Sequence, residues 1–98
     1  MIYLNVWLTV KDPQNIEKVS KLLAEQARMS RLEPGCLRFE VYQSQADTKV
    51  FMLNEHWESQ AAVDKHRLAA AYNTVYKPQV LPLADRVGHP STLICCDS

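Results

Sequence analysis

The sequence predicts an α+β fold in which an antiparallel sheet carries helices on one face. Three segments, residues 2–10, 36–44 and 49–57, alternate apolar and polar side chains with a period of two, which is typical of strands. Two further segments, residues 13–32 and 70–83, repeat apolar residues at helical spacing. The three strand patterns and two helix patterns together indicate a single sheet packed against helices.

The first strand and the first helix are each marked by a local signal. Asp12 and Pro13 follow the strand and are typical of a helix N-cap and of the first helical position. The helix should run to about Leu32, because the next residues, 33–35, are Glu-Pro-Gly, which ends a helix and begins a turn. In the strand, Ile2, Leu4, Val6, Leu8 and Val10 share one face, and Tyr3, Asn5, Trp7 and Thr9 share the other.

The second half of the chain continues the same fold. The short polar turn at residues 45–48 makes the second and third strands a hairpin. Ser59 should cap a short helix that carries His66, and Pro78 should kink the last helix because proline lacks an N–H. The apolar residues 92–96 are expected to form a final strand. The order strand, helix, strand, strand, helix, strand is the split-βαβ, ferredoxin-like pattern, which serves many functions.

Composition and charge narrow the classes of partner. The eleven basic and eleven acidic side chains cancel, whereas nucleic-acid-binding proteins usually carry a surplus of positive charge. No apolar run approaches the roughly 20 residues needed to span a bilayer, and the N-terminal residues do not resemble a secretory signal. We therefore expect one cytoplasmic domain over residues 1–98, without nucleic-acid or membrane partners, that binds a small molecule or a second copy of itself.

Both faces of the predicted sheet carry large apolar side chains. Phe51, Leu53 and Trp57 share one face of the third strand, while Met52 lies on the other, and Trp7 lies on the more polar face of the first strand. One layer of helices covers only one sheet face, and a face left to water should be polar. A second copy of the same sheet is the simplest cover, so the sequence predicts a homodimer joined through sheet faces.

The sequence contains no cofactor or metal motif. Its two glycines, Gly35 and Gly88, cannot form a dinucleotide or phosphate-binding loop. Cys36, Cys95 and Cys96 lack metal-ligand spacing, and we expect these thiols to be reduced and mostly buried. We therefore expect neither a cofactor nor a bound metal.

Two segments resemble the antibiotic biosynthesis monooxygenase family. Residues 34–43, Pro-Gly-Cys-Leu-Arg-Phe-Glu-Val-Tyr-Gln, resemble its second strand. Residues 54–59, Asn-Glu-His-Trp-Glu-Ser, followed by Ala62 and His66, resemble its third strand and the next helix. With the first strand and Tyr72, the resemblance covers nearly the whole chain. It implies a dimeric α+β barrel with a pocket in each subunit between the sheet and the helices.

The resemblance also implies several chemistries. Some relatives oxygenate quinols or polyphenols without metal or flavin, some degrade haem, and others isomerise a phosphorylated autoinducer. Haem-degrading relatives combine an asparagine and a tryptophan, matched by Asn5 and Trp57, with a histidine on the last helix, near whose place this sequence has Tyr76. We set haem aside because that histidine is missing. Residues 70–72 are also Ala-Ala-Tyr where relatives often have Pro-His-Phe or Pro-His-Tyr.

Glu55 and His66 are the candidate catalytic residues. Burial of Glu55 on an apolar strand face would raise its pKa and suit it to take a phenol or enol proton, and a structural pairing with Arg38 or with a backbone group is the alternative. His66 should point inward, as a proton donor and shuttle or as a buried core histidine. If the polar face of the first strand looks toward the helices, the pocket is lined by side chains with a polar tip, namely Asn5, Trp57, Tyr72, Tyr76, Tyr3 and Trp7.

The leading functional hypothesis is a cofactor-independent monooxygenase that acts on a small aromatic or quinol-like substrate, with Glu55 or His66 as the base. The enzyme alternative is an isomerase of a small hydroxy-ketone, with or without a phosphate, that uses the same base without oxygen. The third hypothesis is a non-enzymatic, ligand-binding or stress-associated dimer. Oxygen consumption would separate the first hypothesis from the other two.

Overall fold

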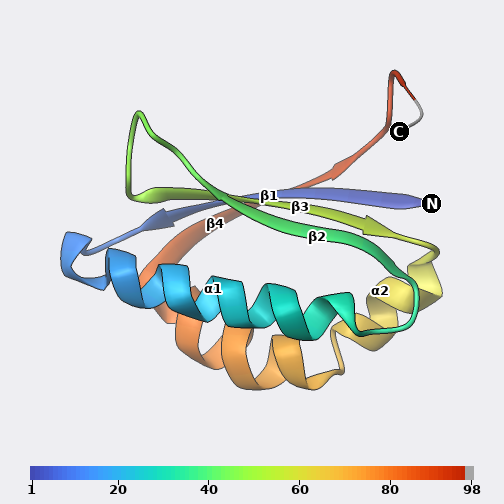
Figure 1. The fold of residues 1–98 in the computed structure, drawn as a ribbon, viewed down its shortest axis with the longest axis horizontal. Coiled ribbons are helices and arrows are strands. Elements are labelled where there is room, and N and C mark those ends of the chain that lie inside the picture. The colour runs from blue at the N-terminus through green and yellow to red at the C-terminus, as the bar shows by residue number, and fades with distance from the viewer. Residues whose placement is uncertain (97–98) are drawn as a thin grey trace.

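The computed structural model describes residues 1–96 and has two layers, a four-stranded antiparallel sheet and a layer of helices on one of its faces (Figure 1). The spatial order of the strands is β2-β3-β1-β4, so β2 and β4 form the edges. This arrangement is the ferredoxin-like α+β fold that the sequence predicts. The strands are β1 (Ile2–Val10), β2 (Cys36–Gln43), β3 (Val50–Trp57) and β4 (Ala84–Ser91), and the main helices are α1 (Ile16–Arg31), α2 (Gln60–His66) and η2 (Ala71–Val80).

The predicted helix starts are confirmed by their capping bonds. The Asp12 side chain accepts a hydrogen bond from the backbone N–H of Gln14 and caps a 3-10 turn, η1 (Pro13–Asn15), which leads into α1. Ser59 caps α2 in the same way, by accepting from the backbone N–H of Ala62. Each cap satisfies a backbone donor that the first turn of a helix leaves without a partner.

Gly35 fixes the turn between α1 and β2. Its φ of +84° lies in the left-handed region, which glycine adopts without the steric cost that other residues meet. A Cβ atom at this position would lie 2.5 Å from the Cβ of Ala62. The glycine therefore allows both the reversal of the chain and the close approach of the turn to α2.

The helix that contains Pro78 differs from the expectation of a kinked α-helix. The segment η2 is a π-helix, and at its end the N–H of Leu81 donates to the carbonyl of Tyr76, five residues earlier. Proline has no N–H to donate, so the wider winding accommodates Pro78 without a break in the helix. π-helical segments are rare and occur frequently at functional sites.

The prediction of a final strand at residues 92–96 was wrong. The last strand is β4, eight residues earlier in the chain, and it pairs with β1 along one edge of the sheet. Its sequence resembles a loop, because it contains Asp85, Gly88, His89 and Pro90. An edge strand forms ladder hydrogen bonds on one side only and therefore tolerates glycine and proline.

Residues 92–96 leave the body of the molecule (Figure 1). Cys95 and Cys96 are exposed there, whereas Cys36 is half-buried with a free thiol. The expectation of burial was therefore wrong for this pair, because it assumed a strand within the sheet.

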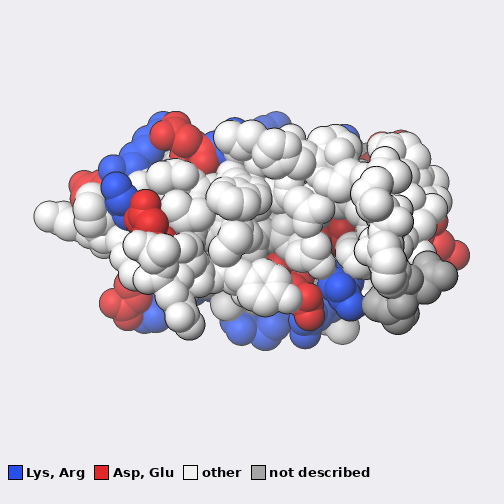
Figure 2. All heavy atoms as spheres, turned by 90° about the horizontal axis from the view of Figure 1, so that it is seen from above, with Lys and Arg blue, Asp and Glu red and all other residues white. Residues whose placement is uncertain are grey.

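Strand alternation divides the sheet into a face covered by the helices and an open face. The side chains of Val6, Leu8 and Phe51 on the covered face are at most 2% exposed and form the core. Seen from above, the open face has most of its charged groups near the rim and a largely uncharged middle (Figure 2). The open face consists of Tyr3, Asn5, Trp7 and Thr9 of β1, Arg38, Glu40 and Tyr42 of β2, Val50, Met52, Asn54 and His56 of β3, and Asp85, Val87, His89 and Ser91 of β4.

No helix within residues 1–96 is both long and apolar enough to cross a membrane.

Candidate functional site

Glu55 lies on the covered face of β3, between Leu53 and Trp57. Its side chain is 6% exposed, and the indole Nε1–H of Trp57 donates to Glu55 Oε1 at 3.0 Å. Strand alternation explains this placement, because residues two apart on a strand share a face. The alternative pairing with Arg38 does not occur, since Arg38 lies on the open face with its Nε 3.8 Å from Glu40 Oε1.

Burial raises the pKa of Glu55 above its usual value, because an apolar environment disfavours the charged carboxylate. The hydrogen bond from Trp57 and the nearby His66, Arg86 and Arg67 side chains act in the opposite direction and moderate this rise. A carboxylate of raised pKa is a stronger base, which suits it to accept a proton from a weakly acidic hydroxyl.

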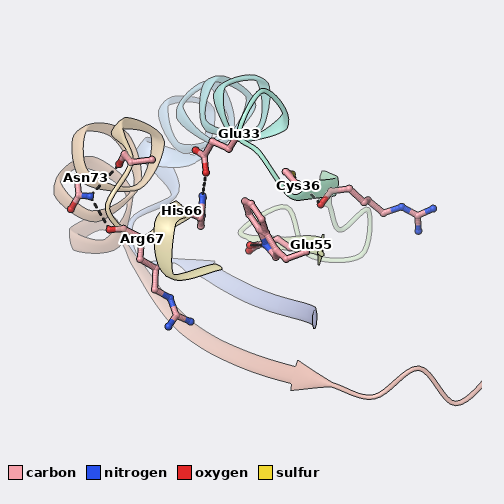
Figure 3. Close-up of polar contacts among 9 residues, drawn as sticks. Glu33, Cys36, Glu55, His66, Arg67 and Asn73 are labelled. Atoms are coloured by element: carbon pink, nitrogen blue, oxygen red, sulfur yellow. Dashed lines mark hydrogen bonds and ion pairs between the residues drawn. The ribbon is translucent and has the colours of Figure 1, made fainter. Parts of the chain in front are cut away.

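His66 is the last residue of α2, and its ring points into the protein toward the end of α1. Its Nδ1 lies 2.7 Å from Oε1 of Glu33, and the two side chains are 5% and 16% exposed (Figure 3). A carboxylate at Nδ1 favours the tautomer that carries its hydrogen there and leaves the Nε2 lone pair free. Glu33 therefore orients His66 for proton transfer through Nε2.

Glu33 was missed by the sequence analysis, which assigned residues 33–35 only the role of ending a helix. The useful signal was Gly35, since its close approach to Ala62 brings this turn against α2. An acidic residue beside such a turn lies within reach of a histidine at the end of the short helix.

His66 belongs to a cluster of five rings, one of which, Trp57, also contacts Glu55. His66 packs on Trp57 with ring centroids 4.5 Å apart and an interplanar angle of 37°, and Tyr72 meets His66 edge-on at 5.8 Å. Glu55 and His66 therefore both contact Trp57, one at the indole N–H and the other on the ring, and Trp57 links them. We call the five rings, Phe39, Trp57, His66, Tyr72 and Tyr76, the aromatic cluster.

Tyr76 connects the aromatic cluster to the edge strand. Arg86 Nε donates to the Tyr76 hydroxyl at 3.0 Å. Burial, opposed by Arg86 and reinforced by the charge of Glu55, raises the pKa of Tyr76 to about 12, so its hydroxyl keeps its proton. Gly88 leaves room for this arrangement, because a Cβ there would lie 2.7 Å from Arg86 Nη1.

Three of the expected pocket residues lie on the open face, away from Glu55. Tyr3 packs edge-on against His56 at 4.7 Å, and Asn5 Oδ1 accepts a hydrogen bond from Asn54 Nδ2 at 2.8 Å. Trp7 is exposed. The structure thus brings together Glu55, Trp57, His66, Tyr72 and Tyr76, and separates Tyr3, Asn5 and Trp7 from them. The aliphatic face of β1 turns toward the helices, since burying aliphatic surface is the larger gain.

A cavity of about 400 Å³ opens next to this cluster, and we call it the β1 cavity. Across the β1–β3 ladder, its wall residues Ile2 and Leu4 pair with Trp57 and Glu55 respectively. Adjacent strands lie about 5 Å apart, so this wall is one strand away from the backbone of β3, and Glu55 itself does not line the cavity. The lining includes Ile2, Leu4, Gln60, Val63, Arg67 and Ser91.

Cys36 adds no reactive group to the site. Burial, together with the charges of Glu33 and Glu55, raises the pKa of its thiol to about 11, which keeps it protonated near neutral pH. Within residues 1–96, no three His, Cys, Asp or Glu side chains gather as ligands for a metal ion.

The sequence matches the family model described as antibiotic biosynthesis monooxygenase over residues 1–77, which includes β1 to α2 and most of η2. No protein of curated function matches the chain.

Solved structures share the whole fold. One described as an antibiotic biosynthesis monooxygenase has a TM-score of 0.88 and 23% identity, and the match covers 97% of this chain and 100% of that one. A Bacteroides thetaiotaomicron protein of unknown function, described as a "possible oxidoreductase", has a TM-score of 0.85 and 27% identity over 92% and 94% of the two chains. A Pseudomonas aeruginosa protein has a TM-score of 0.84 and 19% identity over 96% and 95%. Because the family model matches more than half of this chain, the chain belongs to the antibiotic biosynthesis monooxygenase family.

Proposed function

We propose that the protein is a cofactor-independent monooxygenase that acts on a small aromatic or quinol-like substrate. The observation that carries this proposal is Glu55, a buried carboxylate of raised pKa that Trp57 holds beside an aromatic cluster. Family membership supports oxygenation as the reaction type.

Such a reaction needs no redox group on the protein if the substrate supplies the electrons. Glu55 or His66 takes the proton of a phenol or enol, and the resulting electron-rich anion reacts with dioxygen. One oxygen atom replaces two hydrogens at carbon as a carbonyl, and the other leaves as water. All four electrons that dioxygen accepts come from the substrate.

The chain provides a distinct role for each group of the site. Glu33 orients the ring of His66, and Trp57 holds Glu55. The protonated hydroxyl of Tyr76 and the ring of Tyr72 bind the substrate anion and its flat face, in keeping with an apolar site that has a few placed donors.

The second part of the proposal is a homodimer joined through the open face. Trp7, Tyr42 and Val87 are 51%, 50% and 55% exposed in one protomer, and the middle of this face is largely uncharged (Figure 2). A second copy of the same face would bury these side chains. Tyr3, Asn5 and Trp7 then contribute to the interface.

Oxygen uptake with a panel of quinols, anthrone-like phenols and hydroxy-ketones tests the proposed reaction. We expect uptake with at least one quinol or phenol and incorporation of one atom from ¹⁸O₂ into the product. His66→Ala should lower this rate by about 10²-fold or more if the ring transfers protons. Proton exchange at the substrate carbon without oxygen uptake would contradict the proposal and favour an isomerase.

A further inference from the structure

Residues 92–96 form a tail that has left the core of its own chain. Within residues 1–96, the ladder between β4 and β1 ends at Ser91, and no backbone hydrogen bond holds the tail after it. Leu93 and Ile94 are 42% and 90% exposed, and the tail leaves the sheet on the side opposite the helices (Figure 1). Apolar side chains presented in this way favour contact with another surface.

A groove of about 390 Å³ lies between α1 and β2, and we call it the α1–β2 groove. Its base is apolar, with Ala24 and Ala27 from α1 and Phe39 and Val41 from β2. Because β2 is an edge strand, one side of its backbone has no neighbouring strand. The groove can therefore accept an extended segment with apolar side chains.

The α1–β2 groove continues onto the open face. Tyr42 and Glu40 line it on the β2 side, and both belong to the open face. Tyr42 is 50% exposed, and its hydroxyl donates to Glu40 Oε1 at 2.6 Å. A second protomer that packs on the open face would therefore reach the groove as well.

The α1 side of the groove is positively charged. Arg28 and Arg31 line it, and Arg28 forms an exposed ion pair with Glu25. Arg31 Nε donates to the carbonyl of Phe39 at 3.0 Å, which fixes the guanidinium beside the groove. Asp97, which lies outside the described residues, follows the tail in the sequence. An apolar segment followed by an acidic residue is complementary to an apolar groove flanked by arginines.

The register of the sheet brings the tail and the groove to the same level along the strands. Phe39 pairs with Glu55, Glu55 with Leu4, and Leu4 with Pro90. Phe39 and Pro90 therefore lie in one row, on the two edge strands. In a homodimer whose two-fold axis runs along the strands, β4 of one protomer lies opposite β2 of its partner, and the rows stay level. The tail then begins beside the partner's groove.

The tail is also long enough to reach that groove. Two sheets packed face to face lie about 10 Å apart. The tail has five residues, which span at most about 17 Å when extended. It can therefore cross the interface and arrive at the helix side of the partner's sheet, where α1 and β2 form the groove.

We propose that the tail of each protomer crosses to its partner and lies in the partner's α1–β2 groove, with Leu93 and Ile94 on the apolar base. The occupant of the groove is thus a second copy of this chain. This inference rests on the homodimer of the proposed function and adds an exchanged segment to it. Each tail would also contact Phe39, which packs on His66 at 5.9 Å in the aromatic cluster.

The dissociation constant of the homodimer tests the inference. Leu93→Ser/Ile94→Ser should raise it by about tenfold or more, because both tails lose apolar contact with the partner. Leu32→Ser/Leu68→Ser is the matched control, since these two leucines are 87% and 83% exposed, and it should leave the constant unchanged. Sedimentation equilibrium gives the constants, and circular dichroism shows whether the variants are folded.

Methyl NMR on a mixed dimer locates the tail. One protomer carries a labelled Ile94 methyl group, and its partner carries labelled alanine and valine methyl groups. We expect nuclear Overhauser effects between the chains from Ile94 to Ala24, Ala27 and Val41.

An unchanged constant in the tail variant, an equal rise in the control, or contacts of Ile94 to its own chain or to another surface of the partner would overturn the inference and leave the homodimer standing. A monomeric wild type would overturn both. Neither measurement uses oxygen uptake, so the monooxygenase stands or fails separately.

Discussion

At the scale of single residues, the site depends on Trp57, which contacts both candidate catalytic residues. Its indole N–H donates to Glu55, and its ring packs on His66. Buried indole N–H groups need an acceptor, and here the acceptor is the proposed base. The residue that holds the base is therefore also part of the core.

The tautomer of His66 tests the role of Glu33. In the wild type the neutral ring should carry its hydrogen on Nδ1, because the Glu33 carboxylate lies 2.7 Å away. Glu33→Ala should shift the ring toward the Nε2–H form. Imidazole ¹⁵N chemical shifts distinguish the two forms, and Glu58→Ala, on a neighbouring exposed carboxylate, is the control. An Nε2–H ring in the wild type would show that Glu33 does not orient it.

The raised pKa of Glu55 predicts the sign of a pH effect on stability. The folded state holds the Glu55 proton more tightly than the unfolded state. The wild type therefore loses stability as the pH rises above the pKa that this carboxyl has in the unfolded chain. Glu55→Gln cannot ionise, and its amide oxygen can still accept from Trp57. Its free energy of unfolding relative to the wild type should therefore increase as the pH rises above 4.5, the ordinary pKa of this carboxyl.

Urea denaturation across this pH range measures the difference. A wild type that gains stability over Glu55→Gln with rising pH would mean that a favourable partner, rather than burial, dominates the environment of Glu55.

The placement of a residue in the site could be predicted from the sequence only where the pattern of its own strand or helix was enough to decide it. Alternation places Glu55 beside Trp57, and helical spacing turns His66 inward. The face of β1 depends on which side of the sheet the helices cover, which its own alternation does not specify. That is why Tyr3, Asn5 and Trp7 were grouped with residues that lie on the opposite face.

At the scale of elements, chain reversals with clear chemistry were predicted well, and elements set by tertiary packing were not. Asp12 and Ser59 mark the starts of their helices, because a capping hydrogen bond joins residues that are close in the sequence. β4 could not be recognised, because its strand conformation comes from pairing with β1 and not from its own composition. The π-helical winding of η2 could not be predicted either, because Pro78 is the one feature of its sequence that indicates a departure from a regular α-helix.

Gly35 and Gly88 form a matched pair for testing the turn that brings Glu33 to His66. Gly35→Ala should cost about 2 kcal/mol or more, because it forces a left-handed φ on alanine and meets the fixed Cβ of Ala62. Gly88→Ala should cost about 1 kcal/mol or less, since its Cβ meets only the movable end of Arg86.

Chemical denaturation of both variants gives the comparison. Equal losses would indicate that neither the positive φ nor the contact with Ala62 limits the turn.

At the scale of the whole molecule, one layer of helices leaves the open face uncovered, and the proposed homodimer would cover it. Light scattering at micromolar concentration should give about twice the mass of one chain. Trp7→Lys should produce a folded monomer, because it places a charge in the middle of the proposed interface. Leu68→Lys changes an exposed apolar residue elsewhere and should leave the dimer intact. A monomeric wild type, or equal effects of both substitutions, would contradict the interface.

The comparison of Glu55→Gln with Glu58→Gln in oxygen uptake tests the central claim most directly. The two carboxylates lie three residues apart, one buried in the aromatic cluster and the other exposed after β3. With a quinol that the wild type oxidises, Glu55→Gln should retain the fold and dimer mass but lose about 10²–10⁴-fold in rate, as expected when a general base is removed. Glu58→Gln should keep the wild-type rate. A folded Glu55→Gln that consumes oxygen as fast as the wild type would show that Glu55 is not the base.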